Sequence, residues 1–343
     1  MENIRRVVEE KESPTMGERE DEFSLQRKEL WEKRIELEKE WNLYEGEEED
    51  WINIGVWIKT RILEALLKLT GFYNRGLRNA SNVQLRRLRF IFPNLPQELH
   101  GFKILFATDL HLSKKHLGWY ISVESLLKNF KEEVDLILLG GDYRFGYFGE
   151  ENFVVPLIRD MLASINSRYG VYGVMGNHDV SNVKDQFERS GIKILVNEGL
   201  ELEHNSAKIW LGGVDDPHGF KSSDVSLSLL GRSENTFTIL LSHSPDVFEE
   251  SALWNVDLLL CGHTHGGQIA FPLIGPVYFN TKAPRKYGYG KWNYLKMQGY
   301  TSSGVGTTDV PVRFYTVPEI VIITLFRMPF EDDLTLVLKG KKS

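Results

Sequence analysis

The central part of the chain repeats one pattern, a short continuous run of apolar residues that stops at a polar side chain. Runs of this length are typical of strands buried on both faces of a sheet. Helical stretches separate some of the runs, so the alternation predicts an α/β architecture. The runs span residues 103–108, 135–141, 171–176, 237–242 and 257–262, and the clearest helical stretches span 122–133, 153–169 and 182–190.

The first third of the chain has helical patterns instead, followed by a strand. Residues 24–44 are rich in helix formers with Glu and Lys at helical spacings, which predicts a solvated surface helix. Residues 51–73 predict an amphipathic helix with a wide apolar face and a narrow polar one. Its aromatic and basic residues suit a membrane interface, but a helix that packs on its own protein core has the same pattern. Residues 84–92 partly alternate and predict a strand that ends at Pro93-Asn94.

The distribution of charge also separates the first 50 residues from the rest of the chain. Residues 1–50 carry a net charge of −9 and the remainder +2, within a whole-chain net charge of −7. We therefore expect a charged helical arm at 1–50, an amphipathic helix at 51–80 and a main α/β domain at 83–330. The absence of a basic footprint argues against a nucleic-acid partner.

The cysteine count and the hydropathy limit the type of metal site and the location that this protein can have. Cys261 is the single cysteine, which excludes an intrachain disulfide and any zinc site built on two cysteines. It fits a reducing compartment. No uninterrupted apolar run reaches the ~18 residues that a membrane-spanning helix needs, and the charged first 50 residues do not look like a signal peptide. We expect a cytoplasmic protein that is peripheral on the inner membrane through residues 51–73.

Side chains that bind metals or transfer protons follow each of the five apolar runs. Because ligands of open α/β sheets gather at the carboxyl ends of strands, we expect these side chains to share one site. They are Asp109 and His111 after the first run, Asp142 after the second, Asn177 and His178 after the third, His243 after the fourth, and His263 and His265 after the fifth.

This set predicts a pair of metal ions. Carboxylate oxygen and imidazole nitrogen suit Mn, Fe and Zn alike. Two ions about 3.5–4 Å apart need a bridging anion, and the carboxylate of Asp142 can supply it. In Asp109-x-His111 and His263-x-His265, an extended backbone would put both side chains on one side. Neighbouring glycines permit tight turns and a close approach of the backbone.

The motifs in this order closely resemble the calcineurin-like metallophosphoesterase superfamily over residues 100–325. The motifs are DLH (109–111), GGD (140–142), GNHD (176–179), SH (242–243) and GHTH (262–265). The resemblance implies a four-layer sandwich of two mixed β-sheets flanked by helices, here with an N-terminal helical extension. It also implies two divalent or trivalent ions, for which Mn is our first choice and Fe or Zn the alternatives.

The same resemblance implies a role for each residue. His178 would not bind metal but would act beside the phosphate as an acid or as a stabiliser of the leaving oxygen. Asp179 would either orient His178 through a hydrogen bond or serve as a turn residue. The first ion would be held by Asp109, His111, Asp142 and His265, and the second by Asp142, Asn177, His243 and His263.

A narrower resemblance concerns the substrate. GHTHGGQ (262–268), GGVDDPHG (212–219) and residues 302–325 are similar to the bacterial branch with YkuE-like and YaeI-like phosphodiesterases, near the chlamydial-type UDP-2,3-diacylglucosamine pyrophosphatase. This implies hydrolysis of a phosphodiester or pyrophosphate bond in a lipid-linked substrate such as UDP-2,3-diacylglucosamine, a step in lipid A biosynthesis. The alternatives are a phosphodiesterase for soluble nucleotides or small diesters, and an inactive scaffold with the same fold.

Basic residues shortly after the GHTH motif are candidate substrate ligands. Lys282 and Arg285 have the charge to pair with substrate phosphates. A plain basic surface loop would look the same in the sequence.

Overall fold

The computed structural model describes residues 16–41, 43, 54–114, 117–146, 152–276 and 278–328. The side chains of residues 16–22 and 54–57 lie outside this description, as do residues 1–15 and 44–53 of the predicted arm and amphipathic helix. The division into an arm, an amphipathic helix and a main α/β domain stays a prediction.

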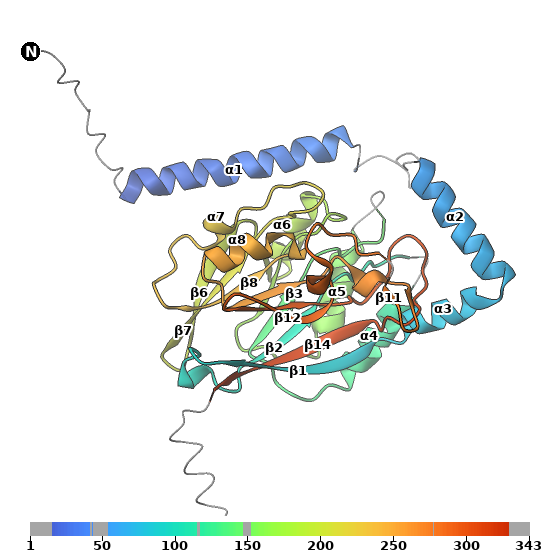
Figure 1. Ribbon diagram of the computed structural model, residues 1–343. Helices are drawn as coiled ribbons and strands as arrows, with labels where there is room; N and C mark the ends of the chain where they lie inside the picture. The colour runs from blue at the N-terminus through green and yellow to red at the C-terminus, as the bar shows by residue number, and fades with distance from the viewer. Residues whose placement is uncertain are drawn as a thin grey trace, which may run out of the picture.

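Two six-stranded mixed sheets form the body of the protein (Figure 1). The first has the order β1-β14-β2-β3-β4-β5 and the second β12-β13-β9-β8-β7-β6. The first sheet contains β1 (Gln84–Phe92), β2 (Lys103–Ala107), β3 (Leu136–Leu139), β4 (Val171–Gly173), β5 (Ile192–Ile194) and β14 (Glu319–Arg327). The second contains β6 (Glu198–His204), β7 (Ala207–Gly213), β8 (Phe237–Leu241), β9 (Leu258–Cys261), β12 (Gly290–Tyr294) and β13 (Met297–Thr301), and β10 (Ala270–Phe271) pairs with β11 (Gly275–Pro276).

The helices in the described part of the chain are α1 (Met16–Glu40), α2 (Ile54–Leu69), α3 (Phe72–Ser81), α4 (Gly118–Lys128), α5 (Val154–Leu162), α6 (Asn182–Arg189), α7 (Val225–Ser228) and α8 (Phe248–Leu253). Helices α4, α5 and α6 cover the outer face of the first sheet, and α7 and α8 cover that of the second. Short 3-10 helices lie at Gln97–Leu99, Pro245–Val247, His265–Gly267 and Arg285–Tyr287.

Three hydrophobic clusters separate four layers. In β2, Leu105 faces a cluster shared with α4, α5 and α6, whereas Phe106 faces a cluster shared with β8 and β9 of the other sheet. In β9, Leu258 joins that central cluster and Leu259 faces a third one with α7 and α8. Successive strand side chains point to opposite faces, so a strand covered on both faces must be apolar throughout. The predicted four-layer sandwich is therefore confirmed.

The strands predicted from the five apolar runs pair in parallel with one another within each sheet. Within the first sheet β2, β3 and β4 are parallel neighbours, and within the second β8 and β9 are parallel neighbours. Parallel neighbours present their carboxyl ends at the same edge of a sheet. The loops with the predicted metal ligands follow these ends.

The N-terminal segment differs from its prediction in two respects. The predicted helix at 51–73 is broken at Gly71, whose φ of 76° is open to glycine but costly for other residues, and the chain continues as α3. The predicted solvated helix at 24–44 is α1, but one face of it is not solvated. Arg34 and Glu38 are fully buried against the body of the protein.

Helix α2 stands away from the body and carries exposed apolar side chains (Figure 1). Ile62, Leu66 and Leu69 are 54%, 53% and 84% exposed. No helix in the described part of the chain is long and apolar enough to cross a membrane.

Candidate metal centre

The residues predicted as metal ligands, together with His178, meet at one edge of the two sheets. All are at most 6% exposed. They lie in the loops after β2 (Asp109, His111), β3 (Asp142), β4 (Asn177, His178), β8 (His243) and β9 (His263, His265).

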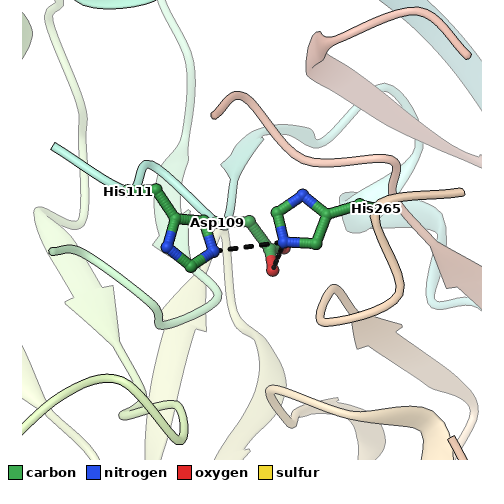
Figure 2. A group of neighbouring side chains, drawn as sticks. All are labelled: Asp109, His111 and His265. Atoms are coloured by element: carbon green, nitrogen blue, oxygen red, sulfur yellow. Dashed lines mark hydrogen bonds and ion pairs between the residues drawn. The ribbon is translucent and has the colours of Figure 1, made fainter. Parts of the chain in front are cut away.

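One half of the centre consists of Asp109, His111 and His265, whose donor atoms converge in Figure 2. His265 Nε2 lies 3.1 Å from His111 Nε2 and 3.4 Å from Asp109 Oδ1. Ligands about 2.1 Å from a common ion lie roughly 3–3.4 Å from one another. The spacing therefore fits a single cation between the three side chains.

The other half consists of Asp142, His243 and His263. His243 Nε2 lies 3.1 Å from Asp142 Oδ2 and 3.2 Å from His263 Nδ1. The same carboxylate oxygen lies 3.5 Å from Nε2 of His111 in the first half. Asp142 thus belongs to both halves, as a bridging ligand must.

Asn177 lies in the loop after β4, next to Asp142. The N–H of the next residue, His178, donates to Asp142 Oδ1 at 2.8 Å. This bond holds the loop after β4 against the carboxylate shared by the two halves.

Backbone carbonyls fix the rings of two candidate ligands, His111 and His243. Nδ1 of His111 bonds to the carbonyl of Arg144 at 3.0 Å, and Nδ1 of His243 to that of Gly140 at 2.8 Å. A carbonyl only accepts, so each Nδ1 must carry the proton, and Nε2 is turned toward the centre. Metal-binding histidines are commonly held in this way.

Burial sets the ionisation of the imidazoles. It lowers the pKa of His111 to about 3, and it also lowers the pKa of His263 and of His265 well below the ordinary value. These three rings are therefore neutral, the form that binds metal. His243 is different: burial lowers its pKa too, but the combined attraction of Asp142, Asp109 and Asp216 outweighs burial and raises the pKa to about 10. A cation would have to displace a proton from this ring.

Five of the candidate ligands have a left-handed backbone. The φ angles of Asp109, His111, Asp142, His263 and His265 lie between 40° and 69°. Left-handed conformations are uncommon outside glycine, and they gather where the surrounding structure holds functional side chains in place. The prediction that Asp109-x-His111 and His263-x-His265 are extended is therefore wrong, since all four residues have a left-handed backbone.

Two glycines allow the carboxylates to enter the centre. A Cβ atom on Gly176 would lie 2.2 Å from Asp142 Oδ1, and one on Gly262 would lie 2.2 Å from Asp109 Oδ2. Neither position has room for a side chain. The glycines in the GNHD and GHTH motifs are thus required by the carboxylates that they face.

Asp179 is a turn residue. Its carboxylate accepts from the backbone N–H of Asp142, Tyr143 and Gly176 at 2.8–2.9 Å. The alternative prediction, in which it orients the ring of His178, is wrong. Nδ1 of that ring instead bonds to the carbonyl of Gly146 at 2.9 Å.

The predicted substrate ligands Lys282 and Arg285 lie on an exposed loop beside the second half of the centre. The N–H of Lys282 donates to Asp246 Oδ1 at 2.9 Å, and Asp246 Oδ2 lies 2.9 Å from His218 Nδ1. The His218 ring lies 4.2 Å from that of His263. The loop is therefore anchored next to a candidate ligand. Arg285 lies over the ring of Phe279.

Two buried arginines next to the centre were not predicted. Arg313 donates to the carbonyl oxygens of His265 and Ser303 at 3.2 and 2.7 Å. Arg34 donates to the loop after β4 from the distant helix α1. Arg313 lies in the segment 302–325 without any feature that marks it as buried, and Arg34 occurs within a pattern of charged residues that is typical of a solvated helix.

Comparisons with known proteins agree with this geometry. The family model described as calcineurin-like phosphoesterase matches residues 102–267. The chain is 31% identical over 244 residues to the uncharacterized metallophosphoesterase YkuE of Bacillus subtilis, covering 67% of this chain and 81% of YkuE. The chain belongs to the calcineurin-like phosphoesterases. The predicted metal-dependent phosphoesterase is thus confirmed.

Other relatives in the calcineurin-like family include one with a stated activity. The chain is 28% identical over 231 residues to the phosphodiesterase YaeI of Escherichia coli, covering 65% of this chain and 82% of YaeI. It is 30% identical over 274 residues to an uncharacterized metallophosphoesterase of Helicobacter pylori, covering 76% of this chain and 68% of that protein. The predicted resemblance to YkuE and YaeI is confirmed.

Proposed function

We propose that this calcineurin-like phosphoesterase binds two cations and hydrolyses a phosphodiester or pyrophosphate bond in a lipid-linked substrate. The observation that carries the proposal is the position of Asp142, which lies within 3.1–3.5 Å of a histidine from each half of the centre. Asp109, His111, Asp142 and His265 would hold one ion, and Asp142, Asn177, His243 and His263 the other.

The cations would acidify a water molecule and withdraw charge from the phosphoryl oxygens. Mn is our first choice of metal, and the same donor set accepts Fe and Zn. The protein's own contribution is to hold the donors in a buried and strained arrangement before the cations bind. Fixed donors in a site that excludes water need little reorganisation during the reaction.

We assign the proton-transfer role to His178. The Gly146 carbonyl fixes its Nδ1, so Nε2 faces the centre, 3.9 Å from Asp142 Oδ2. The ring lies beside the metal ligands, its centroid 4.8 Å from that of His111. A positioned imidazole can protonate a leaving oxygen there.

His178→Ala should leave both metals bound and slow turnover by ~10²-fold, the low end of what a general acid contributes. Metal content and kcat should be measured on the same preparation. His100→Ala removes an exposed histidine that precedes the amino end of β2, opposite the end followed by Asp109, and serves as the control. Loss of metal from His178→Ala would show that the ring is a ligand and not an acid.

The lipid-linked part of the proposal is supported by α2. Its apolar side chains remain exposed, so the described residues do not support packing of this face on the protein core. Lys59, Arg61 and Lys68 lie on the same helix and would favour an anionic lipid surface. A membrane-bound phosphoesterase has direct access to substrates that do not leave the bilayer. Lys282 and Arg285 are our candidates for contact with the phosphates.

A comparison of two substrates tests the proposal. We expect the manganese-loaded protein to hydrolyse UDP-2,3-diacylglucosamine in mixed micelles with a kcat/KM well above that for bis(p-nitrophenyl) phosphate. Hydrolysis of the small diester alone would retain the metal centre and reject the lipid substrate, leaving soluble nucleotides or small diesters as the alternative. Two bound metals with no hydrolysis of either substrate, or of other phosphoesters, would favour an inactive scaffold.

A further inference from the structure

Helix α1 lies outside the residues that the family model matches, yet it inserts a side chain next to the metal centre. Arg34 and Glu38 lie one turn apart on this helix and are both fully buried. Figure 1 shows α1 lying along one side of the body. The centre itself is built by loops from both sheets.

The guanidinium of Arg34 is held by charged and aromatic groups on several sides. Nε donates to Glu38 Oε1 at 2.9 Å, and Nη1 donates to Asp215. The guanidinium carbon lies 4.1 Å from the centroid of the Phe220 ring. A planar fork with fixed donors can satisfy this arrangement, whereas an ammonium cannot reach all of the partners.

The remaining donor of the fork reaches the loop after β4. Nη2 of Arg34 donates to the carbonyl of Gly176 at 3.1 Å and to the carbonyl of Asp179. These two residues directly flank Asn177 and His178. The fork therefore ties together both ends of the segment that carries a candidate metal ligand and the candidate acid.

Glu38 connects α1 to the start of α6. Its carboxylate accepts from the N–H of Ser181 at 2.9 Å and from the hydroxyl of Ser181 at 2.6 Å. Ser181 directly precedes α6. Helix α1 thus holds the loop after β4 through the carbonyl groups of Gly176 and Asp179 and also at Ser181, where α6 begins.

We propose that Arg34 is a positioning residue for the second metal ion, the one assigned to Asp142, Asn177, His243 and His263. Helix α1 would then be required for the metal centre to bind both ions. This inference rests on the proposed two-metal function. Arg34 reaches this segment through the backbone carbonyls of Gly176 and Asp179. It acts by fixing the backbone from Gly176 to Asp179, so that Asn177 meets the second ion and His178 faces the substrate.

The experiment compares two identical substitutions on one helix in the full-length protein. Arg34→Lys keeps the charge but loses the fork. Arg27→Lys is the control, because Arg27 also docks α1, through a 2.9 Å bond to the carbonyl of Asn197, but does not contact the loop after β4. Mn²⁺ titrations followed by calorimetry and by electron paramagnetic resonance would resolve the two binding events, and thermal melts would report folding.

We expect wild type and Arg27→Lys to bind two Mn²⁺ ions with a spin-coupled signal. In Arg34→Lys the second dissociation constant should rise by ~10–100-fold, as for other residues that orient metal ligands, while the first stays unchanged. For bis(p-nitrophenyl) phosphate, kcat at limiting Mn²⁺ should fall with little change in KM, and excess Mn²⁺ should restore part of it.

The outcomes separate this inference from the proposed function. Failure of the wild-type protein to bind two ions would overturn the proposed function, and this inference with it. If the wild-type protein binds two ions and Arg34→Lys binds both with unchanged affinity, this inference alone is overturned. It is also overturned if Arg34→Lys and Arg27→Lys both bind the two ions more weakly and to the same extent. If Arg34→Lys does not fold, Glu38→Gln removes one charge at the same contact. This substitution should weaken binding of the second ion but not of the first, and an unchanged affinity for the second ion would again reject the inference.

Discussion

Asp142→Asn should bind manganese ~10²–10⁴-fold more weakly than the wild-type protein and should show no measurable hydrolysis. Removing one partner of a buried charged pair costs about 3–5 kcal/mol, and each 1.4 kcal/mol is a factor of ten in affinity. The loss should affect both ions, because Oδ2 of Asp142 faces His111 in one half of the centre and His243 in the other. Metal content after dialysis and kcat for bis(p-nitrophenyl) phosphate measure the two effects.

The same strand provides the control for this substitution. Asp135 lies at the opposite end of β3, where its carboxylate accepts from the N–H of Lys103 at 2.7 Å. Asp135→Asn keeps an acceptor at that point and should bind both ions normally. Loss of only one ion from Asp142→Asn would contradict its bridging position, and full activity would remove it from the centre altogether.

The metal centre could be predicted from sequence because strand ends are a local signal. Each candidate ligand directly follows an apolar run, and the parallel neighbours β2, β3 and β4 bring the ends together. Strand β1 was predicted with its exact bounds, since the turn at Pro93-Asn94 marks its end. The left-handed backbone of Asp109 and Asp142 was not predicted, because that conformation is imposed by neighbouring loops and not by these residues themselves.

Other features depend on contacts between distant segments. The pattern of α1 indicates a solvated helix, and nothing nearby in the sequence distinguishes Arg34 from the exposed Lys28 and Lys33. Its burial becomes visible only when Asp215 and the carbonyl of Gly176 are placed beside it. Hydrophobic periodicity identifies which residues pack, but it does not show which charged residue of a helix is buried in an ion pair.

The amphipathic helix leads to the last prediction. Ile62, Leu66 and Leu69 follow one another at intervals of four and three residues, which places them on one face of α2. Replacing all three by Gln keeps a high helix propensity but removes the apolar surface. Full burial of such a side chain is worth about 1.5–3 kcal/mol, so partial burial of three at an interface is worth roughly 4 kcal/mol. Binding to vesicles of phosphatidylethanolamine and phosphatidylglycerol should therefore fall by ~10³-fold.

Sedimentation with these vesicles measures the effect, and exposed leucines elsewhere supply the control. Leu25, Leu253 and Leu295 are 57%, 76% and 73% exposed on other elements, and their replacement by Gln should leave vesicle binding unchanged. Both triple variants should hydrolyse bis(p-nitrophenyl) phosphate at the wild-type rate, because none of the six residues lies in the metal centre. If the α2 variant sediments like the wild-type protein, the helix is not the membrane contact. If it also loses activity on the small diester, the apolar face supports the fold and not a lipid surface.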